Sequence, residues 1–309
     1  MFKPVVIFLF CISFIYLTLY ESSELEDHSF FFTKGDNIYD SMKKDKSFIN
    51  STFFFIIEKV NTLKRRLQTG EYKILYDESA LSVFCKIASG NNVTRKITIP
   101  EGLTTQMIIE ILNNNELLTG EIGEVPEEAS LMPDTYFYKF HDTRKSILDK
   151  MKSQMLTTIQ QMQTKNNTSL SMKDIIILAS IIEKETGLDE ERRIVSSVFH
   201  NRIKRKRRLQ SCPTVIYAIS NRYGKINRPL TKKDLFFKSA FNTYRVGGMP
   251  PTPICCPGKK AIEAALNPAK TNFMYFVLSG DGPNHAFSED FKGQIKNKIN
   301  RKKARIKRK

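Results

Sequence analysis

Cysteine and histidine are scarce in this chain of 309 residues, which contains five Cys and four His. Cys11, Cys85 and Cys212 stand alone, and Cys255-Cys256 are adjacent. Neighbouring cysteines pair with each other only in a strained ring, so no disulfide framework is evident. No His lies at ligand spacing from a Cys, which argues against a metal site. The sequence therefore predicts neither a disulfide-stabilised scaffold nor a metal centre.

Acidic residues are missing from the last eighteen positions, Lys292 to Lys309, which contain ten Lys and Arg. This segment supplies ten of the seventeen net positive charges, so the rest of the chain carries +7. We expect a solvated, disordered tail that can touch any polyanion. No paired Cys/His ligands and no Gly-framed aromatic RNA-binding signature accompany it. The charge therefore does not indicate a specific nucleic-acid partner.

Charged residues are also missing from Pro4 to Tyr20, a run of seventeen residues near the lower length limit of a membrane-spanning helix. Lys3 precedes the run and an acidic segment follows it, which predicts a cytoplasmic N-terminus and translocation of the remaining chain. The segment Leu19–Ser23 lacks a small-x-small cleavage site. An uncleaved anchor is therefore favoured over a removed signal peptide.

The length and the mixed periodicity predict an α+β chain with more than one domain. Apolar spacing predicts helices over 36–46, 53–66, 79–89, 104–113 and 143–164, and strands over 70–76 and 94–99. We take the polar break Lys165–Thr168 as the main boundary. The expected parts are an anchor (1–20), a small α+β module with a connecting region (21–168), a C-terminal domain (169–291) and the basic tail (292–309). A plain spacer is the alternative interpretation of the first module.

One carboxylate lies in an unusual place, within the segment Leu178–Gly187 (LASIIEKETG). Glu185 follows Leu178 at i+7, on the helical face that the two isoleucines share. Glu183, about 200° away around the helix, is expected to face solvent. A carboxyl group held against apolar surface resists ionisation, so its pKa rises and it can donate a proton near neutral pH. The structural alternative is that Glu185 lies at the edge of the apolar face and forms an ion pair with a Lys or Arg.

Polar residues gather on the loops after this helix. We expect the helix 172–186 to end in a left-handed cap at Gly187, and a second helix to follow over 189–205. Amide, hydroxyl and imidazole groups beside a buried acid are typical of a carbohydrate cleft, and the substrate-binding candidates are Gln210, Asn242, Tyr244 and His285. Capping of a strand is the other interpretation of His285. Glu190 and Glu191 are expected to be surface charges.

The motifs LASIIEKETG, LQSCPTVIYAI, FNTY, GMPPTPI, ALNPAKTNFMYFV and NHAF, in this order, resemble the endolytic murein transglycosylases of the MltG (YceG-like) family. The earlier stretches GEYKI, TIPEGLT and LMPDTYFY also match, so the resemblance covers nearly the whole chain. In that family the second Glu of the EKE triplet is the catalytic acid/base, which falls on Glu185 here. Cys212, Phe241 and Cys255-Cys256 depart from the residues that are common at these positions.

The resemblance implies an enzyme anchored in the bacterial inner membrane, with a LysM-like module and a mixed α/β catalytic domain on the periplasmic side. Its substrate would be peptidoglycan glycan strands, and its partners would be peptidoglycan synthases (penicillin-binding proteins). Glu185 would protonate the glycosidic oxygen between N-acetylmuramic acid and N-acetylglucosamine, and would then take a proton from the 6-hydroxyl of the same muramic acid. This chemistry requires no metal and no organic cofactor.

Two alternative functions remain open. A muramidase would hydrolyse the same bond and would need a second carboxylate, such as Asp189 or Glu191. A non-catalytic scaffold would use the aromatic loops and the basic tail to bind cell-wall polymer or a synthase. Substitution of Glu185 separates the scaffold from both enzymes, because a binding protein tolerates Gln at this position.

Overall fold

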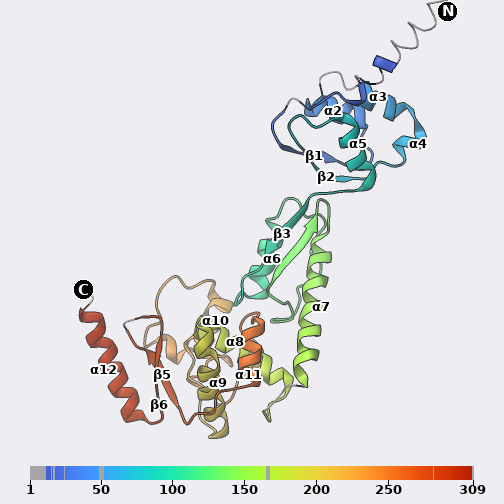
Figure 1. The fold of residues 1–309 in the computed structure, drawn as a ribbon. Coiled ribbons are helices and arrows are strands. Elements are labelled where there is room, and N and C mark those ends of the chain that lie inside the picture. The colour runs from blue at the N-terminus through green and yellow to red at the C-terminus, as the bar shows by residue number, and fades with distance from the viewer. Residues whose placement is uncertain are drawn as a thin grey trace, which may run out of the picture. The chain divides into compact units, whose positions relative to one another are not determined.

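The computed structural model describes residues 12–14, 16, 18–23, 25–48, 52–164, 168–280 and 282–307. They form two compact units (Figure 1). The first contains the described residues up to 97 with 116–119 and 137–143, and the second contains 98–115, 120–136 and 144–307. Much of the expected anchor falls outside the described residues. Within the described part, no helix has the length and apolar character needed to cross a membrane.

The first unit is a small α+β fold. Its elements are β1 (His28–Phe32), α2 (Ile38–Asp45), α3 (Thr52–Lys59), α4 (Asn61–Lys64), β2 (Gly70–Ile74) and α5 (Ala80–Ser89). The strands β1 and β2 pair antiparallel, with His28 opposite Ile74 and Phe32 opposite Gly70. Alternation along β1 buries Phe30 and Phe32 and exposes Phe31. The buried side chains of both strands and of α2, α3 and α5 form one core.

The expected helix 53–66 is interrupted. The chain is extended at Val60, with φ −96° and ψ 96°, and the two short helices α3 and α4 lie on either side. The other expected elements of this region are found to within a few residues of the predicted bounds. Two further strands, β3 (Thr94–Thr98) and β4 (Thr135–Lys139), pair with each other and contribute residues to both units.

The second unit is mostly helical and is built around α8 (Met172–Glu185). Its other elements are α6 (Thr105–Asn113), α7 (Arg144–Gln163), α9 (Asp189–Lys204), α10 (Cys212–Tyr223), the 3-10 turn η1 (Asp234–Phe236), α11 (Lys259–Leu266), β5 (Tyr275–Leu278), β6 (His285–Ser288) and α12 (Phe291–Lys307). Every residue of α8 from Ile175 to Ile182 is buried. A helix that is apolar on all sides belongs in the middle of a core, and α9, α10 and α11 pack around this one.

Several expectations require correction. The compact units do not divide at Lys165–Thr168, because α6 and α7 belong to the second unit. The basic tail is not disordered over its described part, since residues up to 307 form α12, which packs on the hairpin of β5 and β6. The helix α8 ends without a left-handed glycine: Thr186 is extended, with φ −142°, and its N–H donates to the carbonyl of Ile182. The mixed α+β class is confirmed.

Candidate active site

Glu185 is the last residue of α8, and its side chain is held from the side of α10. The hydroxyl of Ser211 donates to Glu185 Oε1 at 2.6 Å. Ser211 is itself buried and stands at the N-cap of α10. Glu185 as a residue keeps some exposed surface, while protein atoms surround its carboxyl group. This combination of burial and partial exposure suits a proton donor.

The segment that presents Ser211 is fixed by threonine hydroxyls. The N–H of Ser211 donates to Thr243 Oγ1 at 3.0 Å, and the hydroxyl of Thr214 donates to the carbonyl of Ser211 at 2.7 Å. The two threonine oxygens contact each other at 2.9 Å. All three residues are buried. The hydroxyl that touches Glu185 is therefore held by a fully buried hydrogen-bond network, which restricts its position.

Arg202 on α9 is a buried cation beneath the same loop. Its Nε donates to the carbonyl of Met274 at 2.7 Å, and its Nη1 donates to the carbonyl of Leu209 at 2.7 Å. The guanidinium also lies 5.2 Å from the centre of the Tyr275 ring. It makes no ion pair with a carboxylate among the described residues. Its charge is close enough to Glu185 to favour the ionised carboxylate.

Burial dominates the electrostatics of Glu185. It raises the pKa of the carboxyl to about 7, against the opposing effects of the Ser211 hydrogen bond and the Arg202 charge. The position at the C-terminus of α8 acts in the same direction as burial, because the carbonyls there disfavour an anion. Glu185 is therefore substantially protonated near neutral pH, as the sequence predicted. It forms no ion pair with a Lys or Arg among the described residues, so the structural alternative does not apply.

An open pocket of about 570 Å³ lies beside Tyr244. Its lining contains three cations and three apolar or aromatic side chains: Arg208, Lys232, Arg245, Leu235, Phe236 and Tyr244. The Tyr244 hydroxyl lies 3.2 Å from the sulfur of Cys212, the residue after Ser211. Burial raises the pKa of Tyr244, and the nearby Cys212 and Glu185 act in the same direction. Tyr244 thus lines this basic pocket and is close enough to Glu185 to feel its charge. The exposed residues of the lining suit a ligand with both anionic groups and ring faces.

Gln210 occupies strained backbone next to Ser211. Its φ is 51°, a left-handed conformation that glycine adopts more readily. The N–H of Gln210 donates to the carbonyl of Thr243, and its Oε1 accepts from Arg202 at 3.3 Å. The residue is exposed. Strain of this kind persists where surrounding contacts impose it, and it is common at functional sites.

Asn242 and His285 are held by internal contacts. The Asn242 amide is fully buried, donates to the carbonyls of Leu235 and Phe237, and accepts from the N–H of Tyr244. Its donors are all used, so in this conformation it orients the loop and does not contact a ligand. His285 begins β6, and its Nδ1 lies 2.7 Å from a carboxylate oxygen of Glu191. This contact gives His285 a structural role at the start of a strand, which was the alternative to a sugar contact.

Two acids near Glu185 differ from expectation. Glu191 is not a surface charge: its carboxylate is nearly buried and also accepts from the N–H of His285. Glu183 does not face solvent, because only 6% of its side chain is exposed. The reason is that Arg192 of α9 pairs with its carboxylate, while Lys184 is the residue of this last turn that is exposed. Glu190 is exposed, as expected.

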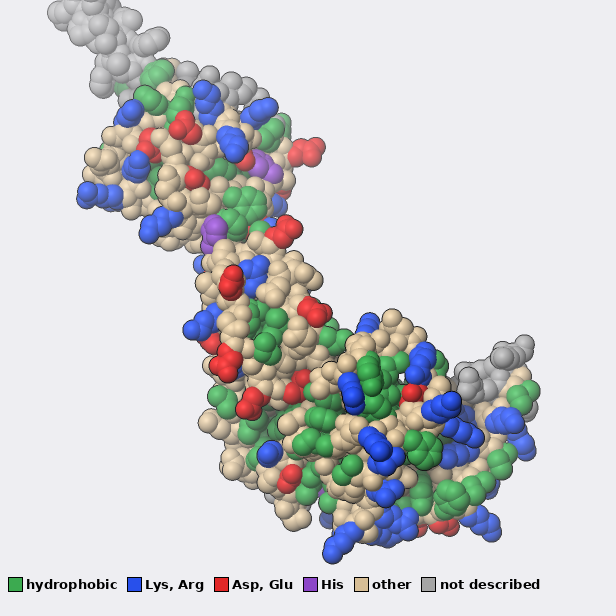
Figure 2. Space-filling model, turned by 180° about the vertical axis from the view of Figure 1, so that it is seen from behind, with side chains coloured by type: hydrophobic (Ala, Val, Ile, Leu, Met, Phe, Trp, Pro, Cys, Tyr) green, Lys and Arg blue, Asp and Glu red, His purple; other side chains and the backbone are tan. Residues whose placement is uncertain are grey.

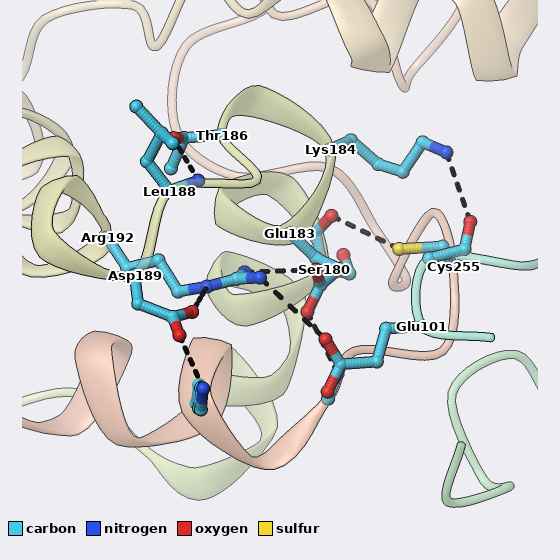
Figure 3. A network of polar contacts seen from close by, with 12 residues as sticks. Glu101, Ser180, Glu183, Lys184, Thr186, Leu188, Asp189, Arg192 and Cys255 are labelled. Carbon is cyan, nitrogen blue, oxygen red and sulfur yellow. Dashed lines mark hydrogen bonds and ion pairs between the residues drawn. The ribbon is translucent and has the colours of Figure 1, made fainter. Parts of the chain in front are cut away.

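Glu183 belongs to an ionic cluster at the end of α8, drawn in Figure 3. Arg192 of α9 donates to Glu183 at 3.0 Å and to Asp189 at 3.1 Å, and it lies 3.7 Å from Glu101. Glu183 also accepts from the N–H of Gly258, just before α11. One buried carboxylate thus ties together the helices α8, α9 and α11. The cluster fixes the end of the helix that carries Glu185.

Sequence reasoning did not assign roles to Ser211, Thr243 or Arg202. Arg202 was visible as a charged residue on the apolar stripe of α9, the same signal that singled out Glu185. Ser211 had no comparable signal, because a serine before a proline-started helix is ordinary. No group of three or more His, Cys, Asp and Glu in the described part of the chain has the arrangement of a metal site.

A family model described as the YceG-like family matches residues 33–300. The chain belongs to this family. A crystal structure of a putative yceG-like protein from Listeria monocytogenes aligns with a TM-score of 0.55 at 26% identity, over 88% of this chain and 99% of that one. The shared fold therefore extends over both units.

Two curated relatives carry the name endolytic murein transglycosylase. The protein from Bacillus subtilis (strain 168) is 36% identical over 161 residues, which is 51% of this chain and 43% of that protein. The protein from Streptococcus pneumoniae serotype 2 is 31% identical over 156 residues, which is 48% of this chain and 28% of that protein. The match to this YceG-like chain thus spans less than half the length of each relative.

Proposed function

We propose that this YceG-like protein is an endolytic lytic transglycosylase that cleaves peptidoglycan glycan strands at internal bonds between N-acetylmuramic acid and N-acetylglucosamine. The observation that carries the proposal is Glu185, a partly exposed residue whose carboxyl group has a pKa of about 7 and accepts a hydrogen bond from Ser211. The names of the two curated relatives agree with it. The basic pocket beside Tyr244 suits a strand that carries sugar rings and the carboxylates of stem peptides.

The proposed reaction uses one carboxyl group twice. Protonated Glu185 donates its proton to the glycosidic oxygen, and the bond between this oxygen and the anomeric carbon of N-acetylmuramic acid breaks. Ionised Glu185 then accepts the proton of the 6-hydroxyl of the same sugar, whose oxygen bonds to the anomeric carbon. The product is a 1,6-anhydro ring, and no water is consumed. The attacking hydroxyl is tethered, which gives this step an intramolecular advantage.

A hydrolytic muramidase is the second candidate, and it needs another carboxylate for the nucleophile or the water. Asp189 is ion-paired with Arg192 and Lys260, and Glu191 is bonded to His285. No carboxylate of the described residues is among the groups that shift the pKa of Glu185. These contacts favour the reaction with a single carboxyl group. A non-catalytic scaffold gives no reason for a proton donor at this position.

The remaining parts of the proposal rest on the sequence. We propose that residues 1–20 anchor the chain in the inner membrane, that the first unit is LysM-like, and that residues 169–291 contain the catalytic machinery on the periplasmic side. Peptidoglycan synthases are the proposed partners, and the proposed role is termination of strand elongation. Gln210 and Tyr244 are the proposed contacts to the substrate, with Asn242 as a positioning residue and His285 as an indirect support through Glu191.

Product chemistry tests the proposal directly. The full chain in detergent is incubated with purified glycan strands, and the fragments are examined by mass spectrometry. We expect internal fragments that end in anhydromuramic acid and are one water lighter than hydrolysis products. Reducing ends would instead identify a muramidase, and intact strands that remain bound to the protein would identify a scaffold.

The hydrogen bond from Ser211 predicts a shift in the pH profile. Donation requires the protonated form of Glu185, so activity falls as the pH rises through the pKa of about 7. The Ser211 hydroxyl stabilises the ionised form and lowers this pKa. In Ser211→Ala the pKa should rise, and the alkaline limb of the activity profile should move about one pH unit higher. Ser220→Ala, on the same helix, should leave the limb in place. A limb that stays or moves to lower pH in Ser211→Ala would contradict this geometry.

A further inference from the structure

The helix α12 is attached to the protein by its polar side. Gln294 is buried and donates to the carbonyl of Phe276, and Asn297 donates to the carbonyl of Phe287. Gly293 packs closely against Ser288. A surface helix normally places its apolar stripe against the core. In α12 the polar and small residues occupy that position.

The apolar stripe of α12 faces outward. Its members are Phe291, Ile295, Ile299 and Ile306, with 61%, 45%, 50% and 64% of their surface exposed. At about 100° per residue, all four fall within about 80° of one another around the helix axis. Phe291 touches the ring of Tyr275, and the isoleucines extend the stripe along the helix. A row of exposed apolar side chains of this length marks a site of interaction.

Cations border the stripe on both sides. The seventeen residues of α12 include eight Lys and Arg and no acidic residue. The helical projection places Lys298 along one edge of the stripe and Lys292, Lys296 and Lys303 along the other. Lys302, which is exposed, falls within the stripe between Ile299 and Ile306 along the helix. In Figure 2, hydrophobic side chains follow this helix with Lys and Arg side chains beside them. The outer face is thus amphipathic and strongly basic.

We propose that this face of α12 lies in the interface of an anionic lipid bilayer and holds the second unit against the membrane surface. An amphipathic helix with a basic polar face binds by burying its apolar side chains at the level of the headgroups, while its cations meet the lipid phosphates. A second copy of the chain is a poor occupant, because two helices with eight cations each would repel. A hydrophilic polyanion would neutralise the cations but would leave the apolar stripe in water.

The chain contains no Trp, so a single introduced Trp reports on one position. The test places Ile299→Trp in the full chain, reconstituted into vesicles of phosphatidylcholine alone or mixed with phosphatidylglycerol. We expect the emission to shift to the blue and to be quenched by brominated lipid in the anionic vesicles, and high salt should weaken both effects. Leu156→Trp, at a position of α7 that is also exposed, should show neither effect. Because the reporter reads position 299 alone, insertion of another part of the chain does not produce the signal.

Charge reversal supplies the second arm of the test. A second protein combines Ile299→Trp with Lys292→Glu, Lys296→Glu and Lys303→Glu. Its quenching by anionic vesicles should fall at least about fivefold, since each cation near the surface contributes about that factor to the membrane affinity. Ile295→Trp is a second reporter on the same stripe and should behave as Ile299→Trp does. Absence of lipid quenching at both positions would overturn the proposal. A blue shift that grows with protein concentration without lipid quenching would also overturn it, in favour of self-association.

Discussion

Replacement of Glu185 by Gln is expected to lower the rate of glycan cleavage by about 100- to 10,000-fold. An amide of nearly the same shape cannot donate the proton to the glycosidic oxygen or accept one from the 6-hydroxyl. The fold should persist, because the amide oxygen can still accept the hydrogen bond that Ser211 donates. The measurement is the initial rate of release of fragments with anhydromuramic ends from purified strands, with far-UV circular dichroism as the check on folding.

Glu190→Gln is the matched control, because Glu190 is an exposed carboxylate five residues further along the chain. It should retain the activity of the natural protein. If Glu185→Gln cleaved strands at the natural rate, Glu185 would not be the proton donor. If the natural protein and Glu185→Gln both bound strands and neither cleaved them, a non-catalytic scaffold would be the better description of the protein.

Replacement of Arg192 by Ala is expected to destabilise the second unit by about 3–5 kcal/mol. Only 6% of the Arg192 side chain and 6% of the Glu183 side chain are exposed. Without the guanidinium, the Glu183 carboxylate would stay buried with an uncompensated charge, bonded only to the N–H of Gly258 among its described partners. The free energy of unfolding can be measured by urea titration followed by circular dichroism. Hydrogen exchange along α8 locates the loss.

Arg193→Ala is the control from the next position on α9. Arg193 is exposed, and its Nε donates to the carbonyl of Asn267, so its loss should cost about 1 kcal/mol. Arg192→Lys should recover part of the stability, because it restores the charge without the paired guanidinium contacts. Equal effects of Arg192→Ala and Arg193→Ala would mean that the ionic cluster at the end of α8 does not hold the helix.

The contrast between Glu185 and Glu183 shows where sequence reasoning succeeds and fails. The periodicity of Leu178, Ile181 and Ile182 placed Glu185 on an apolar face correctly. The same periodicity predicts that Glu183 faces solvent, but only if the opposite side of the helix is exposed. The run from Ile175 to Ile182 is apolar at almost every position, and such a helix is surrounded by others. The number of neighbours around a helix is a property of the packing.

The loop residues illustrate a second limit. Gln210, Asn242 and Tyr244 were chosen because amides and hydroxyls on loops suit a sugar site. Asn242 instead uses its whole amide on backbone groups of its own loop. Residue type indicates which hydrogen bonds are available, whereas only the folded backbone decides which partners receive them. Glu191 was placed at the surface for the same reason, since its partner His285 lies 94 residues away in the chain.

The sequence by itself determined the class of the fold, the positions of most helices, the family through its ordered motifs, and Glu185 as a carboxyl group with a raised pKa. These follow from local periodicity and from motifs that lie within short stretches. Only the tertiary structure decided that Ser211 touches Glu185, that Glu183 is buried with Arg192, and that the basic tail is a helix with its apolar side outward. Each of these depends on contacts between segments far apart in the chain, and burial and hydrogen-bond partners are set by such contacts.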